Sequence, residues 1–352
     1  MRRSNDNWVE RIWYGHSALV WLLVPFSWLY KSIIDIRGSL HRSGVLTAHR
    51  VGVPVVIIGN ITAGGTGKTP LTIWLAKALR DKGYSPGIIS RGYRGKVGPN
   101  PVVAAADSDP TVVGDEAILL VTASGCPVVV HPDRVAAAEK AINMGADVII
   151  ADDGLQHFRL ARDCEIAVID GHRGFGNGRL LPAGPLRENP TRLESVDKVV
   201  VQRVAREPRE ILRRTSDRRP FNFDLKPTSV RRLDGSEIRT MADFTGRKVH
   251  AIAGIGNPNR FFRVLEANGM IIRRHPLVDH AAISPSDISF DDDLDVVMTA
   301  KDAVKCRFPE AGRCWCIDAD VEFEGDEGSL LLRLVLDKIS DSTFAGESTS
   351  AT

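Results

Sequence analysis

The chain alternates between two hydrophobic patterns from residue 53 onward. Largely apolar runs, such as residues 53–58 and 147–151, are typical of strands that are buried on both faces of a sheet. Between such runs lie segments with helical spacing of apolar residues, such as 68–82, which stops at Gly83. The alternation predicts an α/β fold with a parallel sheet covered by helices. Further expected elements are strands at 87–90, 102–105 and 128–131 and helices at 115–123 and 133–144.

A second series of strands and helices begins after residues 158–164, where we place a domain boundary. It comprises expected strands at 165–170, 198–202, 248–254, 295–299 and 314–317 and helices at 258–268 and 329–340. Residues 203–219 hold many arginines with acids between them, which is typical of a solvated helix face. The small and polar residues 341–352 are predicted to form a disordered tail.

The most apolar stretch, residues 18–30, precedes the α/β pattern. It is shorter than the about 20 residues that a spanning helix needs, and it contains Pro25. No small-residue cleavage site follows directly, so we do not expect a secretory signal. Tryptophans, which favour the membrane–water boundary, gather in this part of the chain: Trp8, Trp13, Trp21 and Trp28. The pattern is compatible with a membrane-interfacial helix or with a helix packed on the protein's own core.

Composition and charge narrow the possible classes of function. The 352 residues are 43% hydrophobic and 26% charged, which excludes a disordered, collagen-like or polytopic membrane protein. The 46 Lys and Arg nearly balance the 44 Asp and Glu, so charge gives no argument for nucleic-acid binding. Residues 1–50 nevertheless hold seven basic against three acidic side chains, a surplus suited to anionic headgroups. The five cysteines lack disulfide or zinc spacing and are expected to be buried free thiols.

A glycine-rich loop at 59–69 connects the first expected strand to the first helix of the α/β series. It departs from the strict phosphate-loop pattern at Thr62, which replaces the first glycine. Glycines let backbone amides approach a phosphate, the helix N-terminus adds positive charge, Lys68 can reach the terminal phosphates and Thr69 can bind Mg²⁺. Rather than a glycine-rich turn, we predict a nucleotide site formed by Thr62, Ala63, Gly64, Gly65, Thr66, Gly67, Lys68 and Thr69.

Two acids, Asp152 and Asp153, follow the apolar run at 147–151. Ligands bind at the carboxyl ends of strands in parallel α/β sheets, where an acid can hold Mg²⁺ directly or through water. A simple Asp-Asp-Gly turn is the alternative. The phosphate loop upstream favours the metal-binding interpretation. The sequence contains no guanine-reading Asn-Lys-x-Asp, which argues against a GTPase.

Sequence spacing alone does not decide the role of two further groups of residues. Asp115 and Glu116 open an expected helix, where acids often only cap the first turn, so a catalytic role is one of two interpretations. Arg134 follows another apolar run within His-Pro-Asp-Arg at 131–134. It could steady the charge of a transferring phosphate or form a surface ion pair.

The order of these motifs resembles that of one enzyme family, the tetraacyldisaccharide 4'-kinases. The resemblance spans about residues 13–336 and is carried by the phosphate loop, Ser-Arg-Gly-Tyr at 90–93, Asp-Asp-Gly-Leu-Gln-His at 152–157 and Pro-Ala-Gly-Pro-Leu-Arg-Glu at 182–188. It implies a P-loop α/β domain and a smaller α/β domain with the site in the cleft between them. It further implies transfer of the γ-phosphate of ATP, with Mg²⁺, to the 4'-hydroxyl of tetraacyldisaccharide 1-phosphate, which gives lipid IVA.

The resemblance also implies residue roles. Asp115 would be the base and His280 its helper, and Asp152 and Asp153 would bind Mg²⁺. The substrate-binding residues would be Glu116, Arg187 and Glu188, the last two from the second domain. The full catalytic set would be Lys68, Asp115, Arg134, Asp153 and His280. Two positions depart from the family pattern, because Ala281 replaces the second histidine of Asp-His-His and Ala300 replaces the glutamate of Thr-Glu-Lys-Asp.

The resemblance and the pattern together give a domain scheme. Residues 1–45 would be a membrane-associated helical segment, 46–160 a kinase domain completed by 317–340, 161–316 a second domain and 341–352 a tail. The expected partners are the lipid substrate and the cytoplasmic face of the inner membrane, with peripheral or monotopic attachment and no nucleic acid. The alternatives are a P-loop switch or metal-insertion chaperone, and a small-molecule kinase whose N-terminal helix is only structural.

Overall fold

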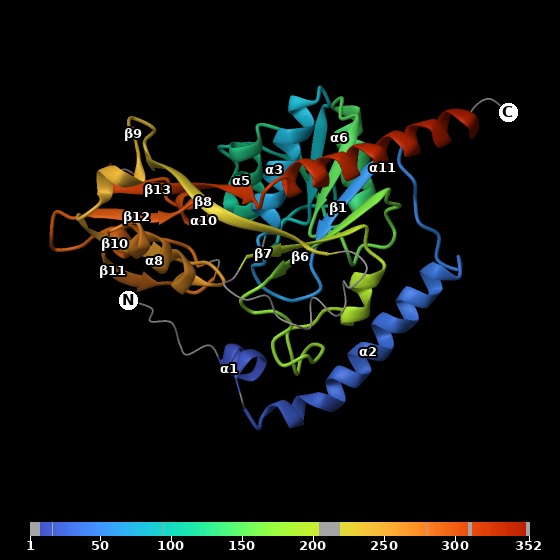
Figure 1. Cartoon of the computed structure of the whole chain (residues 1–352), viewed down its shortest axis with the longest axis horizontal. Helices are drawn as coiled ribbons and strands as arrows, with labels where there is room; N and C mark the ends of the chain where they lie inside the picture. The colour runs from blue at the N-terminus through green and yellow to red at the C-terminus, as the bar shows by residue number, and fades with distance from the viewer. Residues whose placement is uncertain are drawn as a thin grey trace. The chain divides into compact units, whose positions relative to one another are not determined.

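The computed structural model describes residues 8–15, 17–93, 95–203, 219–279, 281–308 and 312–349 (Figure 1). Their contacts divide the chain into two compact units. The larger, which we call the phosphate-loop unit, contains residues 7–108, 112–224 and the residues from 321 onward. The second unit contains 109–111 and 225–320. Both are α/β structures with mostly parallel strands.

The sheet of the phosphate-loop unit has the strand order β8-β7-β6-β1-β5-β2-β4-β3. All its pairs are parallel except β3 with β4. The central strands consist wholly of buried residues, as continuous apolar runs require. The strands are β1 (Val55–Gly59), β2 (Pro86–Ser90), β3 (Val102–Ala104), β4 (Val128–Val130), β5 (Val148–Asp152), β6 (Cys164–Asp170), β7 (Lys198–Gln202) and the beginning of β8 (Phe221–Arg232).

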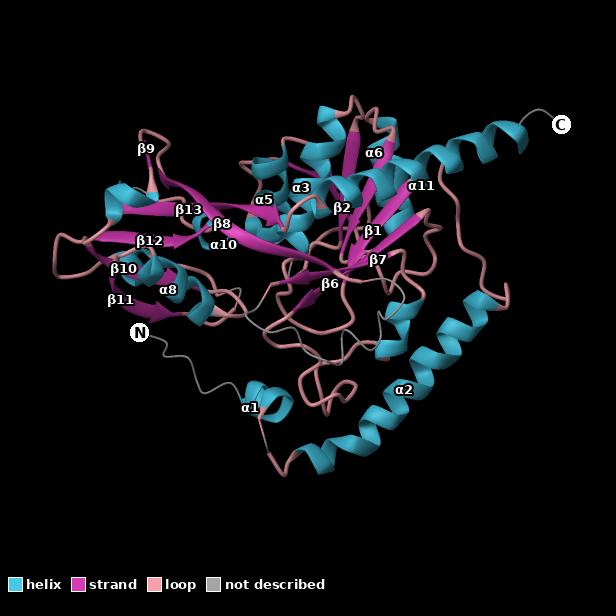
Figure 2. Cartoon of the chain, viewed as in Figure 1, coloured by secondary structure: helices cyan, strands magenta, loops and turns pink. Residues whose placement is uncertain are grey.

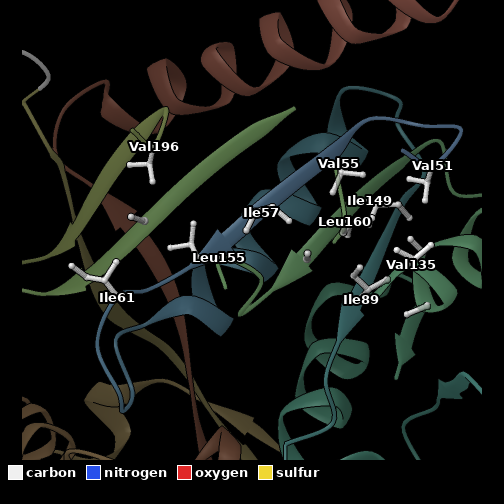
Figure 3. Close-up of a cluster of buried hydrophobic side chains, with 14 of the residues drawn as sticks. Val51, Val55, Ile57, Ile61, Ile89, Val135, Ile149, Leu155, Leu160 and Val196 are labelled. Carbon is white, nitrogen blue, oxygen red and sulfur yellow. The ribbon is translucent and has the colours of Figure 1, made fainter. Parts of the chain in front are cut away.

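Helices cover this sheet and bury its apolar side chains. Ile57 of β1, Ile149 of β5 and Leu155 after β5 belong to one buried cluster, which Figure 3 shows. The buried positions of the C-terminal helix, such as Leu331 and Val335, recur every four residues and therefore lie on one face. The helices are α3 (Lys68–Asp81), α5 (Asp115–Ser124), α6 (Arg134–Asn143), α11 (Glu327–Thr349) and the 3₁₀ turn η1 (Pro190–Glu194), and the residues of α4 (Pro110–Val113) are divided between the two units.

Two N-terminal helices, α1 (Trp8–Tyr14) and α2 (Val20–Arg42), belong to the same unit (Figure 2). The inner face of α2 buries Val20 and Val24 in a small cluster with Ala183. Elsewhere on α2 large apolar side chains are exposed, namely Trp21, Leu22, Phe26, Trp28, Leu29, Ile33 and Ile36. Within the described part of the chain, none of the helices combines the length and the apolar character needed to cross a membrane.

The second unit has the strand order β11-β10-β12-β13-β8, with the short β9 paired to β8. Its core contains Phe244, Phe262 and Trp315. The strands are the remainder of β8, β9 (Ile238–Arg239), β10 (Lys248–Ala253), β11 (Ile271–Pro276), β12 (Asp295–Thr299) and β13 (Cys314–Phe323), whose end lies in the phosphate-loop unit. The helices are α8 (Pro258–Ala267), α9 (Pro285–Ile288), α10 (Ala300–Ala303) and the 3₁₀ turn η2 (Met241–Phe244).

The division into units differs from the sequence-based boundary. Residues 161–224 belong with the phosphate loop because β6 pairs with β1 and β7 pairs with β6, which makes their strands part of the same sheet. The segment expected to be a tail is helical as far as Thr349, in a stretch that contains no proline to end α11. All five cysteines are buried and free, as expected. Most of the arginine-rich segment 203–219 lies outside the described residues.

Candidate active site

The site is built around the turn from β1 into α3. The strand delivers the chain to Gly59, and α3 begins at Lys68. Gly67, which precedes α3, has a φ of 89°, a backbone conformation that glycine adopts without strain. The first amides of α3 therefore point into the loop, where a helix N-terminus attracts anions.

The first half of the phosphate loop is held by a neighbouring segment. Ala63 N–H donates to the carbonyl of Pro185 at 2.7 Å, and Thr62 forms a β-bridge with Leu186. The Arg187 N–H in turn donates to the carbonyl of Ile61 at 2.7 Å. Thr62 and Ala63 were predicted to hold nucleotide, but the Ala63 amide is already occupied. The part of the loop that remains exposed is Gly64 and Gly65.

Asn60 fixes the second half of the loop from inside. Its side chain is fully buried, and Nδ2 donates to Thr66 Oγ1 at 3.1 Å. The Asn60 carbonyl accepts from Gln156 Nε2 at 3.0 Å. These bonds connect the loop to the segment that follows the acid pair, so loop and acids are held as one assembly.

The acid pair lies at the carboxyl end of β5, beside β1 in parallel register. Asp153 has a φ of 55°, in the left-handed region that a non-glycine residue rarely adopts. Its carboxylate accepts two bonds at 2.9 Å from Arg187 Nη1 and lies 3.5 Å from Lys68 Nζ. Asp152 is buried and accepts from Thr72 Oγ1 at 3.2 Å. The two neighbouring acids thus have different partners.

The two acids also differ in protonation. Burial raises the pKa of Asp152 to about 7, and the negative charge of Glu116 adds to the increase. Burial would also raise the pKa of Asp153, but the charges of Lys68 and Arg187 outweigh it and lower that pKa well below the usual range. At neutral pH Asp153 is therefore a fixed anion between two cations, whereas Asp152 readily exchanges its proton.

Arg134 opens α6 and is 3% exposed. Its Nη1 donates to the His131 carbonyl at 3.0 Å and its Nη2 to the Asp152 carbonyl at 3.4 Å. Burial lowers its pKa to about 10, so it stays charged at neutral pH. The surface ion pair that the sequence left open is therefore excluded, and the charge of Arg134 is directed to the end of β5.

Asp115 and Glu116 form the first turn of α5, which packs against α3. Asp115 is buried, and its Oδ1 accepts from the Glu116 N–H at 3.0 Å. The charge of Glu116 raises the pKa of Asp152, so the first turn of α5 lies near the acid pair. The two acids of this turn therefore stand at the start of a helix, as capping residues do, and also lie near Asp152.

Arg187 and Glu188 lie in the phosphate-loop unit and not, as predicted, in a second domain. Their position follows from the pairing of the Pro185–Arg187 segment with the loop. Glu188 Oε1 accepts from Gln156 Nε2 at 2.5 Å. The sequence prediction missed Gln156 and Thr72 as site residues. Thr72 could have been found, because it lies one helical turn after Lys68 and so on the same face of α3.

The predicted helper of the base, His280, lies outside the described residues. The adjoining Asp279 forms an ion pair with Lys301 at 3.4 Å within the second unit. Asp302 is fully buried there and accepts from the Gly254 N–H at 2.9 Å and from Thr299 Oγ1 at 2.7 Å. These bonds hold the residue that follows β10 in place. Asp302 therefore has a structural role.

The donor set suits a magnesium ion that binds together with a nucleotide. No cluster of three His, Cys, Asp or Glu side chains able to hold a metal ion occurs among the residues that the structure describes. Mg²⁺ in nucleotide sites, however, takes only one or two protein oxygens and fills its shell with phosphates and water. The hydroxyl of Thr69 at the start of α3 and the carboxylate of Asp152 at the end of β5 are hard oxygen donors of this kind.

Comparison with known proteins gives one consistent match. The family pattern described as LpxK, tetraacyldisaccharide-1-P 4'-kinase, matches residues 19–337. The tetraacyldisaccharide 4'-kinase of Nitrosococcus oceani is 43% identical over 328 residues, which cover 93% of this chain and 94% of that protein. That of Methylobacillus flagellatus is 45% identical over 327 residues, with 92% and 94% covered. The crystal structure of LpxK from Aquifex aeolicus in complex with ATP is similar with a TM-score of 0.75 at 27% identity and covers 91% and 99% of the two chains.

Proposed function

The chain belongs to the tetraacyldisaccharide 4'-kinase family, and from this premise we propose how its residues perform the reaction. The enzyme is an ATP-dependent kinase of lipid A biosynthesis. It transfers the γ-phosphate to the 4'-hydroxyl of tetraacyldisaccharide 1-phosphate and produces lipid IVA. The observation that carries the assignment of the site is the approach of Lys68 Nζ to Asp153 at 3.5 Å, where the phosphate loop meets the end of β5.

ATP binds along the exposed half of the phosphate loop. The amides of Gly64–Thr69 surround the β- and γ-phosphates, and Lys68 neutralises the charge that develops during transfer. Asp153 holds Lys68 in place until phosphate arrives and shares its negative charge with Arg187. Thr62 and Ala63 act indirectly, through their pairing with the Arg187 segment.

Thr69 and Asp152 would hold Mg²⁺ in the nucleotide complex. The ion supplies neutralisation of charge on the β- and γ-phosphates when it is bound. We assign the ligand to Asp152 and not to Asp153, because both carboxylate oxygens of Asp153 are occupied by Arg187. Thr72 orients Asp152, and Arg134 adds positive charge behind it. Because the pKa of Asp152 is about 7, its carboxyl can lose the proton to solvent when Mg²⁺ binds.

Asp115 receives the proton of the acceptor. The 4'-oxygen attacks the γ-phosphorus, the bond from that phosphorus to the β,γ-bridging oxygen breaks, and ADP leaves with the electron pair. The hydroxyl proton passes to Asp115, with His280 as the expected relay. Glu116 and Glu188 face the acceptor from α5 and from the Arg187 segment. The position of Glu116 is supported by its charge, which raises the pKa of Asp152.

The exposed apolar face of α2 lies on the cytoplasmic surface of the inner membrane. Leu22, Phe26 and Leu29 recur at helical spacing and are each more than 60% exposed. Two polar side chains of α2 bond to the phosphate-loop unit. Ser27 donates to the Leu180 carbonyl at 2.8 Å, and Tyr30 donates to the Arg187 carbonyl at 3.0 Å. The surface suited to the bilayer therefore adjoins the segment that bears Arg187, as a lipid substrate requires.

The test is a transfer assay with purified tetraacyldisaccharide 1-phosphate, ATP and Mg²⁺, with mass spectrometric identification of the product. We expect a product heavier by one phosphate at the 4'-position, and none with Lys68→Ala. A folded protein that hydrolyses GTP without an acceptor and makes no phosphorylated lipid would instead support the alternative of a P-loop switch. Efficient transfer to a water-soluble acceptor alone would support a small-molecule kinase.

A further inference from the structure

An arginine lies beside the exposed part of the phosphate loop, on the side away from the acid pair. Strand β1 carries the loop, and its two neighbours in the sheet are β5, which ends in the acids, and β6. Parallel strands present their carboxyl ends at one edge of a sheet, so the residues after β6 flank the loop. Arg173 lies just after the end of β6. A Cβ built on Gly64 would lie 3.6 Å from Arg173 Nη1, so this side chain reaches the loop where its backbone is exposed.

The backbone of Arg173 is fixed by the end of β6. Asp170 is the last residue of this strand, and its side chain is buried. Asp170 Oδ1 accepts from the His172 N–H at 2.8 Å and from the Arg173 N–H at 3.3 Å. The Asp170 carbonyl accepts from the Gly174 N–H at 2.8 Å. These bonds hold the turn in place, so a movement of the guanidinium group requires only a change in the side chain of Arg173.

The other end of the guanidinium group faces the N-terminal helix. Arg173 Nη2 donates to Glu10 Oε1 of α1 at 2.6 Å, and Arg173 Cζ lies 5.1 Å from the centre of the Tyr14 ring. The Glu10 side chain is 48% exposed, and an ion pair so open to water contributes little free energy. A triphosphate carries several negative charges and would therefore displace Glu10 as the partner of Arg173.

Helix α1 does not depend on this ion pair for its position. Asn177 Nδ2 donates to the Ile12 carbonyl at 3.0 Å, and the Asn177 N–H donates to the Trp13 carbonyl at 2.8 Å. Trp13 Nε1 donates in turn to the Pro182 carbonyl at 3.0 Å. Loss of the ion pair would thus leave α1 attached to the loop after β6, which permits the arginine to have a second role.

We infer that Arg173 is an arginine finger supplied by the chain itself: when ATP binds, its guanidinium group leaves Glu10 and contacts the γ-phosphoryl group. The inference rests on the proposed function, which places the β- and γ-phosphates at the amides from Gly64 onward. A phosphate oxygen that accepts from such an amide lies about 3 Å from it, within reach of Arg173 Nη1 after a change in side-chain torsion. Lys68 and Arg134 lie on the side of β5. Arg173 would complete the positive charge around the transferring group from the side of β6.

The test is steady-state kinetics with tetraacyldisaccharide 1-phosphate and ATP. In Arg173→Gln we expect kcat to fall by about 10²- to 10³-fold, as the loss of one preorganised donor predicts, while the KM for ATP stays near that of wild type. Arg173→Lys keeps the charge but loses the planar fork and should recover part of the loss. Glu10→Gln weakens the competing ion pair, so its kcat should be equal to or above that of wild type. Arg274→Gln, which removes an arginine paired with Glu266 in the second unit, is the matched control.

A second measurement separates the transferring group from bound nucleotide. Aluminium fluoride together with Mg²⁺ and ADP mimics the phosphoryl group in transfer, and calorimetry with the acceptor lipid present gives the affinity for ADP with and without fluoride. We expect fluoride to tighten ADP binding in wild type and Glu10→Gln, and Arg173→Gln to lose most of this effect. ADP alone should bind equally to all three, which shows that the variants are folded. If Arg173→Gln does not bind ADP, the comparison rests on Arg173→Lys, whose kcat should still be lower than that of wild type.

Three results would overturn the inference. A kcat that falls equally in Arg173→Gln and Glu10→Gln would mean that the ion pair only positions α1. A rise in the KM for ATP at unchanged kcat would assign Arg173 to binding of nucleotide in the ground state. Unchanged kinetics in both Arg173 variants would show that this side chain does not act on the phosphates. Wild-type enzyme that makes no 4'-phosphorylated product would contradict the proposed function itself, whereas an active wild type with any of these three results contradicts only the arginine finger.

Discussion

Arg187 Nη1 donates to both carboxylate oxygens of Asp153 at 2.9 Å. One nitrogen thereby occupies both acceptors of a residue that also attracts Lys68. The bond joins the segment after Pro185 to the end of β5, two parts of the chain that are 34 positions apart. It sets the charge balance of the site before any ligand arrives.

Replacing Arg187 should impair catalysis through Lys68. In Arg187→Ala, Asp153 keeps Lys68 as its remaining ion-pair partner and competes with phosphate for it. We expect kcat to fall by about 100-fold, comparable to the loss of one electrostatic donor in other enzymes. Steady-state kinetics would measure this. Arg50→Ala, which removes an exposed arginine that pairs with Asp163, should leave kcat unchanged. A wild-type kcat in Arg187→Ala would contradict the idea that Arg187 keeps Asp153 from competing with phosphate for Lys68.

Substitution of the expected base should act on the chemical step alone. Asp115→Asn keeps the size of the side chain but cannot accept a proton, so we expect kcat to drop by roughly 10²- to 10⁴-fold. Equilibrium binding of ATP should change little. Glu116→Gln serves as the contrast and should mainly raise the KM for the acceptor. Unchanged kcat in Asp115→Asn would reject it as the base.

Thr72 should control the demand for Mg²⁺. Thr72→Val has the same shape but loses the hydroxyl that orients Asp152 Oδ1 at 3.2 Å. We expect the Mg²⁺ concentration for half-maximal activity to rise by about 10-fold or more, as when partners of metal ligands are removed. Thr122→Val, whose hydroxyl bonds only to its own helix, is the matched control. Equal Mg²⁺ dependence in both variants would exclude Asp152 as a ligand oriented by Thr72.

The second unit should lose stability in mild acid. Burial lowers the pKa of His275, and the positive charges of His250 and Arg273 lower it further. The remaining charged groups around this pair are Asp292, which bonds to His250 and Arg273, and Arg313, which bonds to Asp292 and Asp293. Because the folded state binds the proton less well, the contribution of His275 is complete above the unfolded pKa of about 6.5 and is lost as pH falls through the lower folded pKa.

The measurement is thermal unfolding of full-length protein between pH 5 and 8. Wild type should lose more stability on acidification than His275→Asn. The exposed His49→Asn on the phosphate-loop unit should follow wild type. A pH dependence that is the same in wild type and His275→Asn would contradict this prediction.

The outer face of α2 should govern membrane binding. Leu22→Glu/Leu29→Glu introduces two acids where apolar side chains meet the interface. We expect the variant to leave the liposome fraction in flotation and to lose activity on lipid, while ATP binding persists. The matched control, Leu330→Glu on the exposed side of α11, should still float. Flotation of the α2 variant at the wild-type level would place the membrane-binding surface elsewhere.

The hydrophobic pattern of the sequence was sufficient to locate most of the strands. The runs that became β1, β5 and β7 are continuous and apolar, and each was located to within two residues. The pattern missed β8 and β11, because many of their residues are exposed or half-buried and both strands contain a pair of adjacent arginines. Tertiary pairing, not local propensity, makes these segments extended.

The site residues also fall into those that the local sequence predicts and those that only tertiary contacts place. Lys68, Thr69 and Asp152 could be found because a loop and a strand end place them by local geometry alone. The position of Arg187 could not, since it depends on backbone pairing between residues that are distant in the chain, such as Ala63 and Pro185. The buried state of Arg134 likewise follows from packing of α6 against β2, which the sequence does not encode locally.

The close contacts of Gly92 and Gly114 leave the loop after β2, which carries Gly92, little freedom to change its course. Any side chain at Gly92 would collide with Val130, and any at Gly114 would meet the Tyr93 carbonyl. Insertions or rerouting there would displace Asp115 at the same time. Changes between Gly92 and Gly114 are therefore tolerated in the side chains more readily than in the path of the backbone, because a rerouted backbone would move Asp115 with it.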